Sequence, residues 1–240
     1  MDIIKINNLN KSYANKQALI DISLSVKENT LFGLLGENGA GKSTLIKILS
    51  GLIQKDSGEV TIDGHSLDKS LPCIQRIINI SPQESAIAPN LNVKENLEFF
   101  ADIYGKKDKD RIQRIIDSFS LNEVLHQKAK TLSGGYKRRL SIAISLVSEP
   151  KILFLDEPTL GLDVLARREL WKIIRSLKGK ITIVLTSHYL EEIEALCDDV
   201  AILSKGRLLA RGNVDHIKEL GHSSSFEDAF VSIIEGGEKE

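Results

Sequence analysis

The feature that most restricts how this chain can fold is a glycine-rich segment between a short apolar run and a helical pattern. Leu31–Leu35 is uniformly apolar apart from one glycine, as a strand buried in a parallel sheet is. Residues 36–43 follow it and match the pattern G-x-x-x-x-G-K-S/T in full. From Lys42 to Leu52 the apolar residues recur at helical spacing, and this helix is expected to end near Gly51. A strand, a tight loop and a helix in this order predict a phosphate-binding site.

Each residue type in this loop has a defined use at a phosphate group. Glycines let the backbone turn so that successive N–H groups converge on phosphate oxygens. Lys42 is expected to bridge the β- and γ-phosphates, Ser43 to ligate Mg²⁺, and Thr44 to donate to the α-phosphate. The alternative is a glycine-rich turn with an accidental lysine. The residues predicted to bind ATP with Mg²⁺ are therefore Gly36, Glu37, Asn38, Gly39, Ala40, Gly41, Lys42, Ser43 and Thr44.

Strand and helix patterns on both sides of the loop predict an α/β fold. Before and just after it, strands are expected at residues 3–6 and 20–26, with a further strand pair at residues 59–63 and 76–80. Residues 93–119 are expected to be largely helical, with a solvated turn at residues 105–110.

The second half of the chain alternates strands and helices more regularly. Strands are expected at residues 152–155, 181–185 and 200–203, separated by helices that begin near Leu165 and Tyr189. This β–α–β order predicts a mainly parallel sheet with helices on its faces.

Composition argues against several other classes of protein. Of the 240 residues 42% are hydrophobic and 27% charged, which is ordinary for a soluble domain with a sizeable core. No run approaches the roughly 18 apolar residues of a membrane span, and residues 1–5 lack the basic region of a secretion signal. A net charge of −1 gives no reason to expect a nucleic-acid partner. Cys73 and Cys197, far apart in sequence, favour a reducing compartment.

Two carboxylates follow the apolar run at residues 152–155. Alone, Asp156 and Glu157 could be a solvated acidic turn. After a phosphate-binding loop they are interpreted as the Mg²⁺ carboxylate, Asp156, and the base for the attacking water, Glu157.

A further motif lies shortly before these carboxylates. Residues 132–139 read Leu-Ser-Gly-Gly-Tyr-Lys-Arg-Arg, in which Ser133 is a good N-cap for a helix whose N-terminus forms a second anion site. Together with the loop and the acidic pair, this motif resembles the signature of ATP-binding cassette (ABC) proteins, and the resemblance runs from about residue 3 to residue 209. Residues 186–194 and 226–230 are most similar to the stand-alone ATPase subunits of two-component exporters.

The resemblance implies a P-loop NTPase fold with a mainly parallel core, an N-terminal antiparallel β subdomain and a helical subdomain carrying the signature. It implies one domain over residues 1–235, with the helical subdomain at about 85–150 and a flexible tail at 236–240. It also implies residue roles: Tyr13 stacks on adenine, Gln83 reaches Mg²⁺ and senses a membrane partner, His188 contacts the γ-phosphate, and Asp163 communicates between two copies. Outside the family pattern, Tyr13 would be a half-exposed strand aromatic and His188 a structural histidine.

The same resemblance implies an assembly. Two copies pack head to tail, so that ATP on the loop of one copy meets Ser133, Gly134 and Gly135 of the other. Glu157, Lys42, Gln83 and His188 form the expected catalytic set that hydrolyses ATP to ADP and phosphate. The work drives transport, with export favoured, through a polytopic membrane permease subunit that docks on residues 93–119. The chain would then be peripheral at the cytoplasmic face of the membrane.

Other functions fit the motifs less well. A cassette ATPase acting on DNA or the ribosome would carry a coiled-coil insertion or two cassettes, whereas one loop and one signature occur here. A small-metabolite kinase would explain the loop but not residues 132–135, and Glu157 argues against a non-catalytic ATP-gated module. The one departure from the family pattern is Tyr136, where many members have glutamine.

Overall fold

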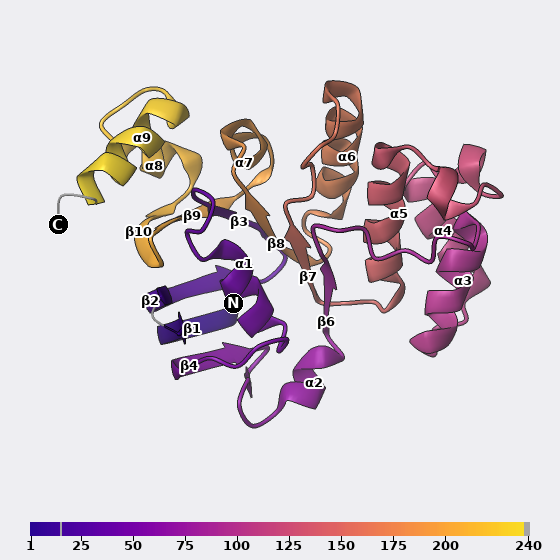
Figure 1. Ribbon diagram of the computed structural model, residues 1–240, viewed down its shortest axis with the longest axis horizontal. Helices are drawn as coiled ribbons and strands as arrows, with labels where there is room; N and C mark the ends of the chain where they lie inside the picture. The colour runs from indigo at the N-terminus through magenta and orange to yellow at the C-terminus, as the bar shows by residue number, and fades with distance from the viewer. Residues whose placement is uncertain (15, 238–240) are drawn as a thin grey trace.

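Two β-sheets with a helix between them dominate one half of the molecule in the computed structural model, which describes residues 1–14 and 16–237 (Figure 1). The smaller sheet is antiparallel, with the strand order β2-β1-β4-β5. Its strands are β1 (Asp2–Tyr13), β2 (Lys16–Lys27), β4 (Ser57–Ile62) and β5 (His65–Ser66). The strands predicted at residues 3–6 and 20–26 are the inner parts of β1 and β2, which confirms an antiparallel N-terminal sheet.

The larger sheet has the order β10-β9-β3-β8-β7-β6, and only β10 runs antiparallel to its neighbour. Its strands are β3 (Leu31–Leu35), β6 (Ile78–Ser81), β7 (Ile152–Asp156), β8 (Thr182–Ser187), β9 (Asp199–Ser204) and β10 (Arg207–Gly212). The prediction of a mainly parallel core is therefore confirmed. Strand β10 follows β9 after a short turn and lies beyond the last predicted strand.

One strand pairing predicted from the sequence is wrong. Residues 59–63 and 76–80 do not pair with each other, because β4 pairs with β1 and β6 pairs with β7. Helix α2 (Leu71–Gln75) lies between them and carries the chain from one sheet to the other. Val60 and Ile62 of β4 are buried in the same hydrophobic cluster as Ile4 and Ile6 of β1, the strand with which β4 pairs.

Helix α1 (Lys42–Leu49) is packed between the two sheets. Its buried residues Leu45, Ile46, Ile48 and Leu49 share a hydrophobic cluster with Phe32 and Leu34 of β3. Leu31 and Leu35 belong to the cluster on the opposite face of β3, as the period-2 alternation of a strand requires. The helix ends at Leu49 with Ser50 as its C-cap, close to the predicted end near Gly51.

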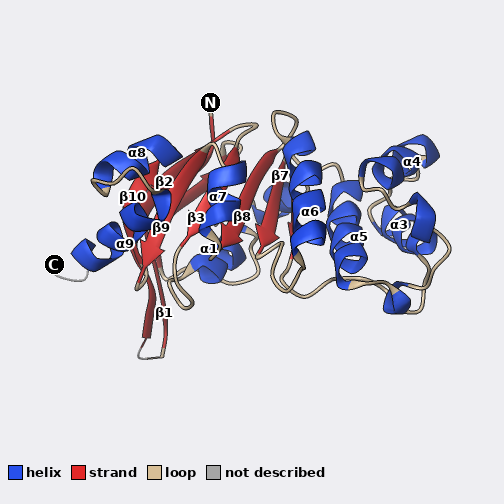
Figure 2. Ribbon diagram, turned by 90° about the horizontal axis from the view of Figure 1, so that it is seen from above, coloured by secondary structure: helices blue, strands red, loops and turns tan. Residues whose placement is uncertain are grey.

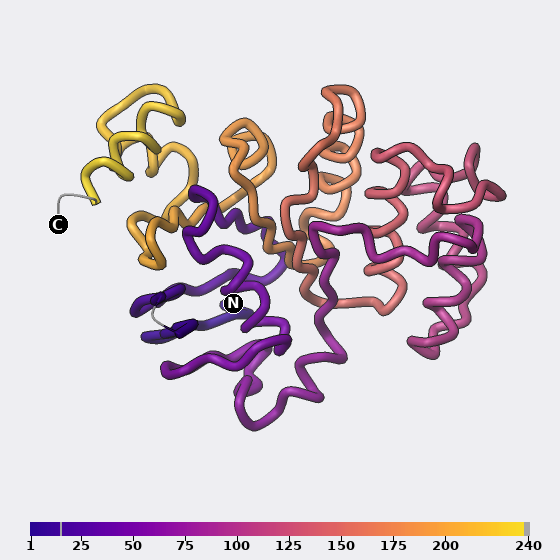
Figure 3. The backbone as a smooth tube through the Cα atoms, in the orientation of Figure 1, coloured from indigo at the N-terminus to yellow at the C-terminus, as the bar shows by residue number. Residues whose placement is uncertain are grey.

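A group of helices lies at one end of the core sheet (Figure 2). It contains α3 (Val93–Ile103), α4 (Lys109–Ser118), the 3₁₀ turns at Asn122–Val124 and Ala129–Thr131, and α5 (Gly134–Val147). The predicted turn at residues 105–110 is confirmed for residues 105–108, where Gly105 at φ 67° follows α3, whereas Lys109 and Asp110 already belong to α4. Two connections join this group to the sheet, one after β6 and one before β7 (Figure 3).

The remaining helices cover the sheet elsewhere. They are α6 (Val164–Leu177), α7 (Leu190–Leu196), α8 (Val214–Leu220) and α9 (Phe226–Gly237). Gly236 and Gly237, which were expected to belong to a flexible tail, are part of α9, and a side chain at Gly237 would come within 2.8 Å of Leu209. Residues 238–240 of that expected tail lie outside the described residues. Among the helices of the described chain, none has the length and apolarity needed to cross a bilayer.

Candidate functional site

The loop between β3 and α1 has the open geometry that phosphate binding requires. Gly41 has φ 107°, and a side chain there would come within 2.6 Å of the Ala18 carbonyl, so only glycine fits. Gly41 is also the N-cap of α1, and no side chain of the described residues caps this helix. The first N–H groups of α1, with their partial positive charge, therefore remain available to an anion.

Lys42 is the first residue of α1, and only 6% of its surface is exposed. Its ammonium donates to the carbonyls of Gly36 at 2.6 Å and Glu37 at 3.1 Å, and lies 3.7 Å from a carboxylate oxygen of Glu157. Burial lowers the pKa of Lys42, and the nearby carboxylates Glu157 and Asp156 oppose that shift. A positive charge is thus held among the loop carbonyls and next to the acidic pair.

Asp156 ends β7 directly behind the loop. Its Oδ1 atom accepts hydrogen bonds from the Ser43 hydroxyl at 3.1 Å and from the Thr186 hydroxyl at 2.6 Å. Parallel pairing of β7 with β8 sets Asp156 opposite Thr186 and explains the second contact. Thr186 was not predicted from the sequence as a site residue; its signal is the pair of polar residues, Thr186 and Ser187, that follows the apolar residues 183–185 of β8.

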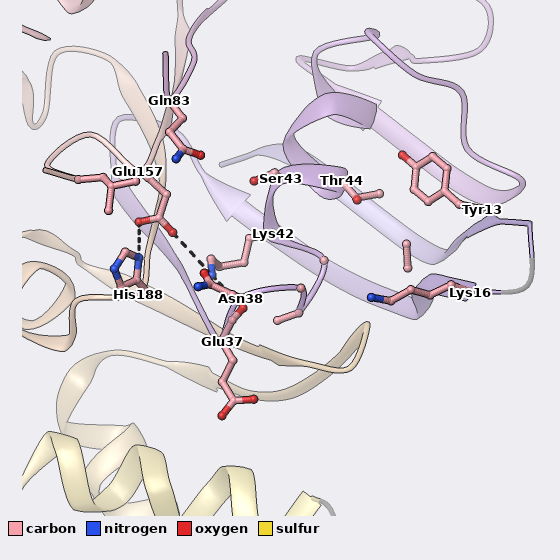
Figure 4. Close-up of a pocket in the computed structure, with 15 residues that line it drawn as sticks. Tyr13, Lys16, Glu37, Asn38, Lys42, Ser43, Thr44, Gln83, Glu157 and His188 are labelled. Atoms are coloured by element: carbon pink, nitrogen blue, oxygen red, sulfur yellow. Dashed lines mark hydrogen bonds and ion pairs between the residues drawn. The ribbon is translucent and has the colours of Figure 1, made fainter. Parts of the chain in front are cut away.

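Glu157 follows Asp156 in a left-handed backbone conformation with φ 47°, which few residues other than glycine adopt. Its N–H donates to the Thr186 hydroxyl at 2.9 Å, which helps to hold this turn. One carboxylate oxygen faces Lys42 and the other lies 2.8 Å from Nδ1 of His188 (Figure 4). Buried to 8% exposure between two nitrogen groups, the carboxylate has a fixed orientation.

Lys42, Ser43, Glu157 and His188 line one cavity of about 440 Å³, a size typical of small-ligand sites, whereas Asp156 and Thr186 are not among its lining residues. In Figure 4, Glu157, His188 and Gln83 lie on one side of Lys42, and Tyr13 lies on the other side, beyond Ser43 and Thr44. Lys16, Ala18 and Leu160 also line it and were not predicted. Lys16 is opposite Tyr13 in the β1–β2 register, so recognition of a hairpin around Tyr13 could have found it.

Some predicted residues lie outside this cavity. Ser133 and Gly134, both exposed, and Gly135 form the start of α5, where the Ser133 side chain accepts from the Tyr136 N–H at 3.4 Å. The predicted N-cap is confirmed, and none of the three residues lines the cavity. Asp163 is the N-cap of α6 and accepts from the N–H groups of Leu165 and Ala166. The structure therefore does not bring Ser133, Gly134, Gly135 or Asp163 into the cavity that the loop residues line.

The donor atoms fit a nucleotide and its magnesium ion. No group of three or more His, Cys, Asp or Glu side chains in the described chain could hold a metal. The donors that do lie together are the Ser43 hydroxyl and the Asp156 carboxylate, with Gln83 at the cavity. Oxygen donors with a single carboxylate suit Mg²⁺, which keeps waters and binds together with phosphate oxygens.

The fold and this loop define a P-loop nucleotide-binding domain. The family model described as "ABC transporter" matches residues 19–160. The chain therefore belongs to the ABC transporter family, and its relatives are ATP-binding subunits of such transporters.

Curated relatives cover most of the chain. The linearmycin resistance ATP-binding protein LnrL of Bacillus subtilis is 39% identical over 88% of this chain and 69% of its own length. The daunorubicin resistance ATP-binding protein DrrA3 of Streptomyces coeruleorubidus is 36% identical over 90% of this chain and 69% of its own. The probable multidrug ABC transporter ATP-binding protein YbhF of Escherichia coli is 35% identical over 99% of this chain but only 43% of its own length.

Solved structures agree with this assignment. An ATP-binding subunit of an ABC transporter superposes with a TM-score of 0.85 at 29% identity, covering 97% of this chain and 99% of that one. The cbiO1 protein of Clostridium perfringens, part of the transporter complex cbiONQ, gives 0.80 at 26% identity over 96% and 98%. The predicted P-loop fold is confirmed.

Proposed function

We propose that this chain hydrolyses ATP with Mg²⁺ and that Glu157 is the base for the attacking water. The observation that carries the proposal is the position of the Glu157 carboxylate, held between Lys42 at 3.7 Å and His188 at 2.8 Å within the loop cavity. A base must be oriented and within reach of the γ-phosphate, and these two contacts orient it. Lys42 and His188 are both expected to contact that phosphate.

The other residues have separable tasks. The N–H groups at the start of α1 and the Lys42 ammonium bind the phosphates. Tyr13 stacks on the adenine ring at the far end of the cavity. Ser43, Asp156 and Gln83 would hold Mg²⁺, which when bound neutralises charge on the phosphate oxygens. Glu157 takes the proton of the attacking water, so the catalysis is mostly positioning and charge neutralisation.

A second copy of the chain completes the site. The signature residues Ser133 and Gly134 are exposed and do not line the cavity of their own chain. Close to Asp163, the side chains of Leu160, Val164 and Leu165 are 40%, 60% and 74% exposed. Apolar side chains exposed beside a nucleotide cavity favour a protein partner there, and a head-to-tail copy would cover them.

ATP hydrolysis by this chain is expected to drive transport through a separate membrane subunit. On α3 and just after it, Phe99, Ile103 and Tyr104 are exposed by 40 to 60%, and they follow the Gln83 segment in sequence. This apolar patch supports docking of a polytopic permease and a peripheral position at the cytoplasmic face of the membrane. Relatives named for resistance to linearmycin and daunorubicin favour export.

The test of catalysis is the substitution Glu157→Gln, which keeps the shape and removes the base. ATP should still bind, hydrolysis should fall by roughly 100-fold or more, and an ATP-bound dimer should accumulate. Phosphate release and light scattering measure the two effects. Glu191→Gln, on the exposed surface of α7, is the matched control. Normal turnover by the Glu157 variant would remove Glu157 from its proposed role.

The test of the partner is co-purification of the tagged chain from membranes. A polytopic membrane protein bound to it, and lost when Phe99 and Ile103 are changed to serine, supports the transporter assignment. Recovery with ribosomes or DNA instead would contradict it.

A further inference from the structure

Arg138 is a buried arginine of α5, just over one helical turn after Ser133, to which no function has been assigned above. Its side chain is 5% exposed. Residues 138–147 of α5 are all buried, so this part of the helix is packed on every side, whereas Ser133 and Gly134 at its N-terminus are exposed. A buried cation needs partners that account for its position.

The partners of Arg138 are backbone carbonyls of two segments far away in sequence. Its Nε donates to the Pro158 carbonyl at 2.9 Å and its Nη2 to the Asp156 carbonyl at 2.9 Å. Its Nη1 donates to the Pro82 carbonyl and lies 3.5 Å from that of Gln83. One guanidinium thus connects α5 to both flanks of Glu157 and to the segment that carries Gln83.

The Arg138 guanidinium remains protonated, although no carboxylate in the described part of the chain forms an ion pair with it. Burial lowers its pKa to about 10, and the nearby charges of Asp156 and Glu192 oppose the shift. The group is therefore fully protonated at neutral pH, and every N–H group can donate. A planar fork of five donors reaches carbonyls in different directions, which a lysine ammonium cannot do.

We propose that Arg138 is a positioning residue that sets the orientation of Glu157 and links it to Gln83 and to the signature helix. The proposal rests on the ATPase function argued above. Its consequence is that a shift of α5 on contact with a second copy, or of the Gln83 segment on contact with a membrane subunit, moves the backbone that carries the base. Arg138 touches no substrate; it acts through three backbone carbonyls.

The neighbouring residue gives a matched control. Arg139 is on the same helix and is similarly buried at 7%, but its guanidinium bonds to Glu169 of α6 and lies 4.5 Å from the ring of Tyr136. Arg138→Lys and Arg139→Lys therefore make the same chemical change at similar burial, and only the first breaks the links to Glu157 and Gln83.

The experiment compares these two variants in steady-state hydrolysis and in amide hydrogen exchange. Arg138→Lys should lower kcat roughly tenfold or more, because a small misplacement of a base has a large effect on rate. Its KM for ATP should change less than about twofold, since the phosphate loop is untouched. Amides of Gln83, Glu157 and Thr159 should exchange faster. Arg139→Lys should change neither kcat nor these amides.

Three results would overturn the proposal: an unchanged kcat in a folded Arg138→Lys protein, an equal loss in both variants, or unchanged exchange at the three amides. If Arg138→Lys fails to fold, Arg138→Gln is measured in the same way. A wild-type chain without hydrolysis, alone or with its partner, would contradict the ATPase function and not the structural link, which the exchange data test separately.

Discussion

The two helix N-termini at α1 and α5 are both suited to anions, but they are built differently. At α1 the cap is a glycine with φ 107°, and a lysine with 6% exposure lies directly after it. At α5 the cap is Ser133, whose hydroxyl accepts a hydrogen bond from an N–H of its own helix, and Ser133 and Gly134 are exposed. The α1 terminus opens into a cavity with acidic and basic groups around it, whereas the α5 terminus faces outward.

This contrast supports the proposal that α1 binds nucleotide within one chain, whereas α5 contacts nucleotide only in a dimer. The α1 terminus has the charge, the cavity and the oriented carboxylate that nucleotide binding needs. The α5 terminus has a helix dipole and small residues, and Ser133, Gly134 and Gly135 do not line the nucleotide cavity of their own chain. Substitutions at the two ends should therefore separate binding by one chain from events that need two.

The largest expected effect is that of Lys42→Ala at α1. Removing charge-assisted hydrogen bonds to phosphate should weaken ATP binding by about 3 kcal/mol, roughly 100-fold, in the isolated chain. Calorimetry at fixed salt measures it. Lys47→Ala, on the exposed side of the same helix, is the control. Unchanged affinity in the Lys42 variant would contradict the assignment of the α1 terminus.

Ser133→Arg should act only where two chains meet. Its bulk would fill the space expected for the nucleotide of the second copy and remove one hydrogen bond to phosphate, lowering hydrolysis roughly 10- to 100-fold. ATP affinity of the single chain should stay as in the wild type. Light scattering with ATP in the Glu157→Gln background reads the dimer directly. Dimerisation and turnover at wild-type levels would show that α5 is not the second half of the site.

Tyr13→Ala tests the end of the cavity away from Glu157. Loss of an aromatic contact with adenine should weaken ATP binding by about 1 kcal/mol, which raises the Kd several-fold. The affinity for inorganic triphosphate should stay unchanged. Titration with ATP and with inorganic triphosphate separates the contacts to adenine from the contacts to phosphate. An equal loss for both ligands would indicate that Tyr13 supports the hairpin instead.

The smallest effect concerns Glu192, a buried carboxyl near Arg138 that accepts from the Trp171 indole at 3.1 Å. Burial raises the pKa of Glu192. The folded state then binds more protons than the unfolded state between the ordinary glutamate pKa and the raised one, so stability falls as the pH rises through this window. Relative to Glu192→Gln, the wild type should lose about 1.4 kcal/mol for each unit of pKa difference.

Denaturant unfolding from pH 4 upward, with Glu191→Gln as the exposed control, measures this trend. Parallel stability curves for the wild type and the Glu192 variant would mean that the carboxyl is not perturbed in the folded chain.

The sequence predicted the parts of the site that lie in contiguous motifs. The loop, the acidic pair at the end of β7 and the cap of α5 depend on local spacing, and the structure has each where it was expected. Thr186 and Arg138 could not be predicted in this way, because each bonds to groups 18 to 56 residues away and the acceptors of Arg138 are backbone carbonyls, which any residue type supplies. The pairing of β4 and β6 failed for a similar reason, since local patterns do not say which sheet a strand joins.

The left-handed backbone at Glu157 has a consequence for selection. A residue with a side chain costs on the order of 1 kcal/mol in this conformation, whereas glycine costs nothing and asparagine little. Laboratory evolution or consensus design that selects for thermal stability alone should therefore favour Gly or Asn at position 157. The resulting protein should be more stable and should lack the proposed catalytic base. Under the proposed function, glutamate at this position exchanges some stability for ATP hydrolysis.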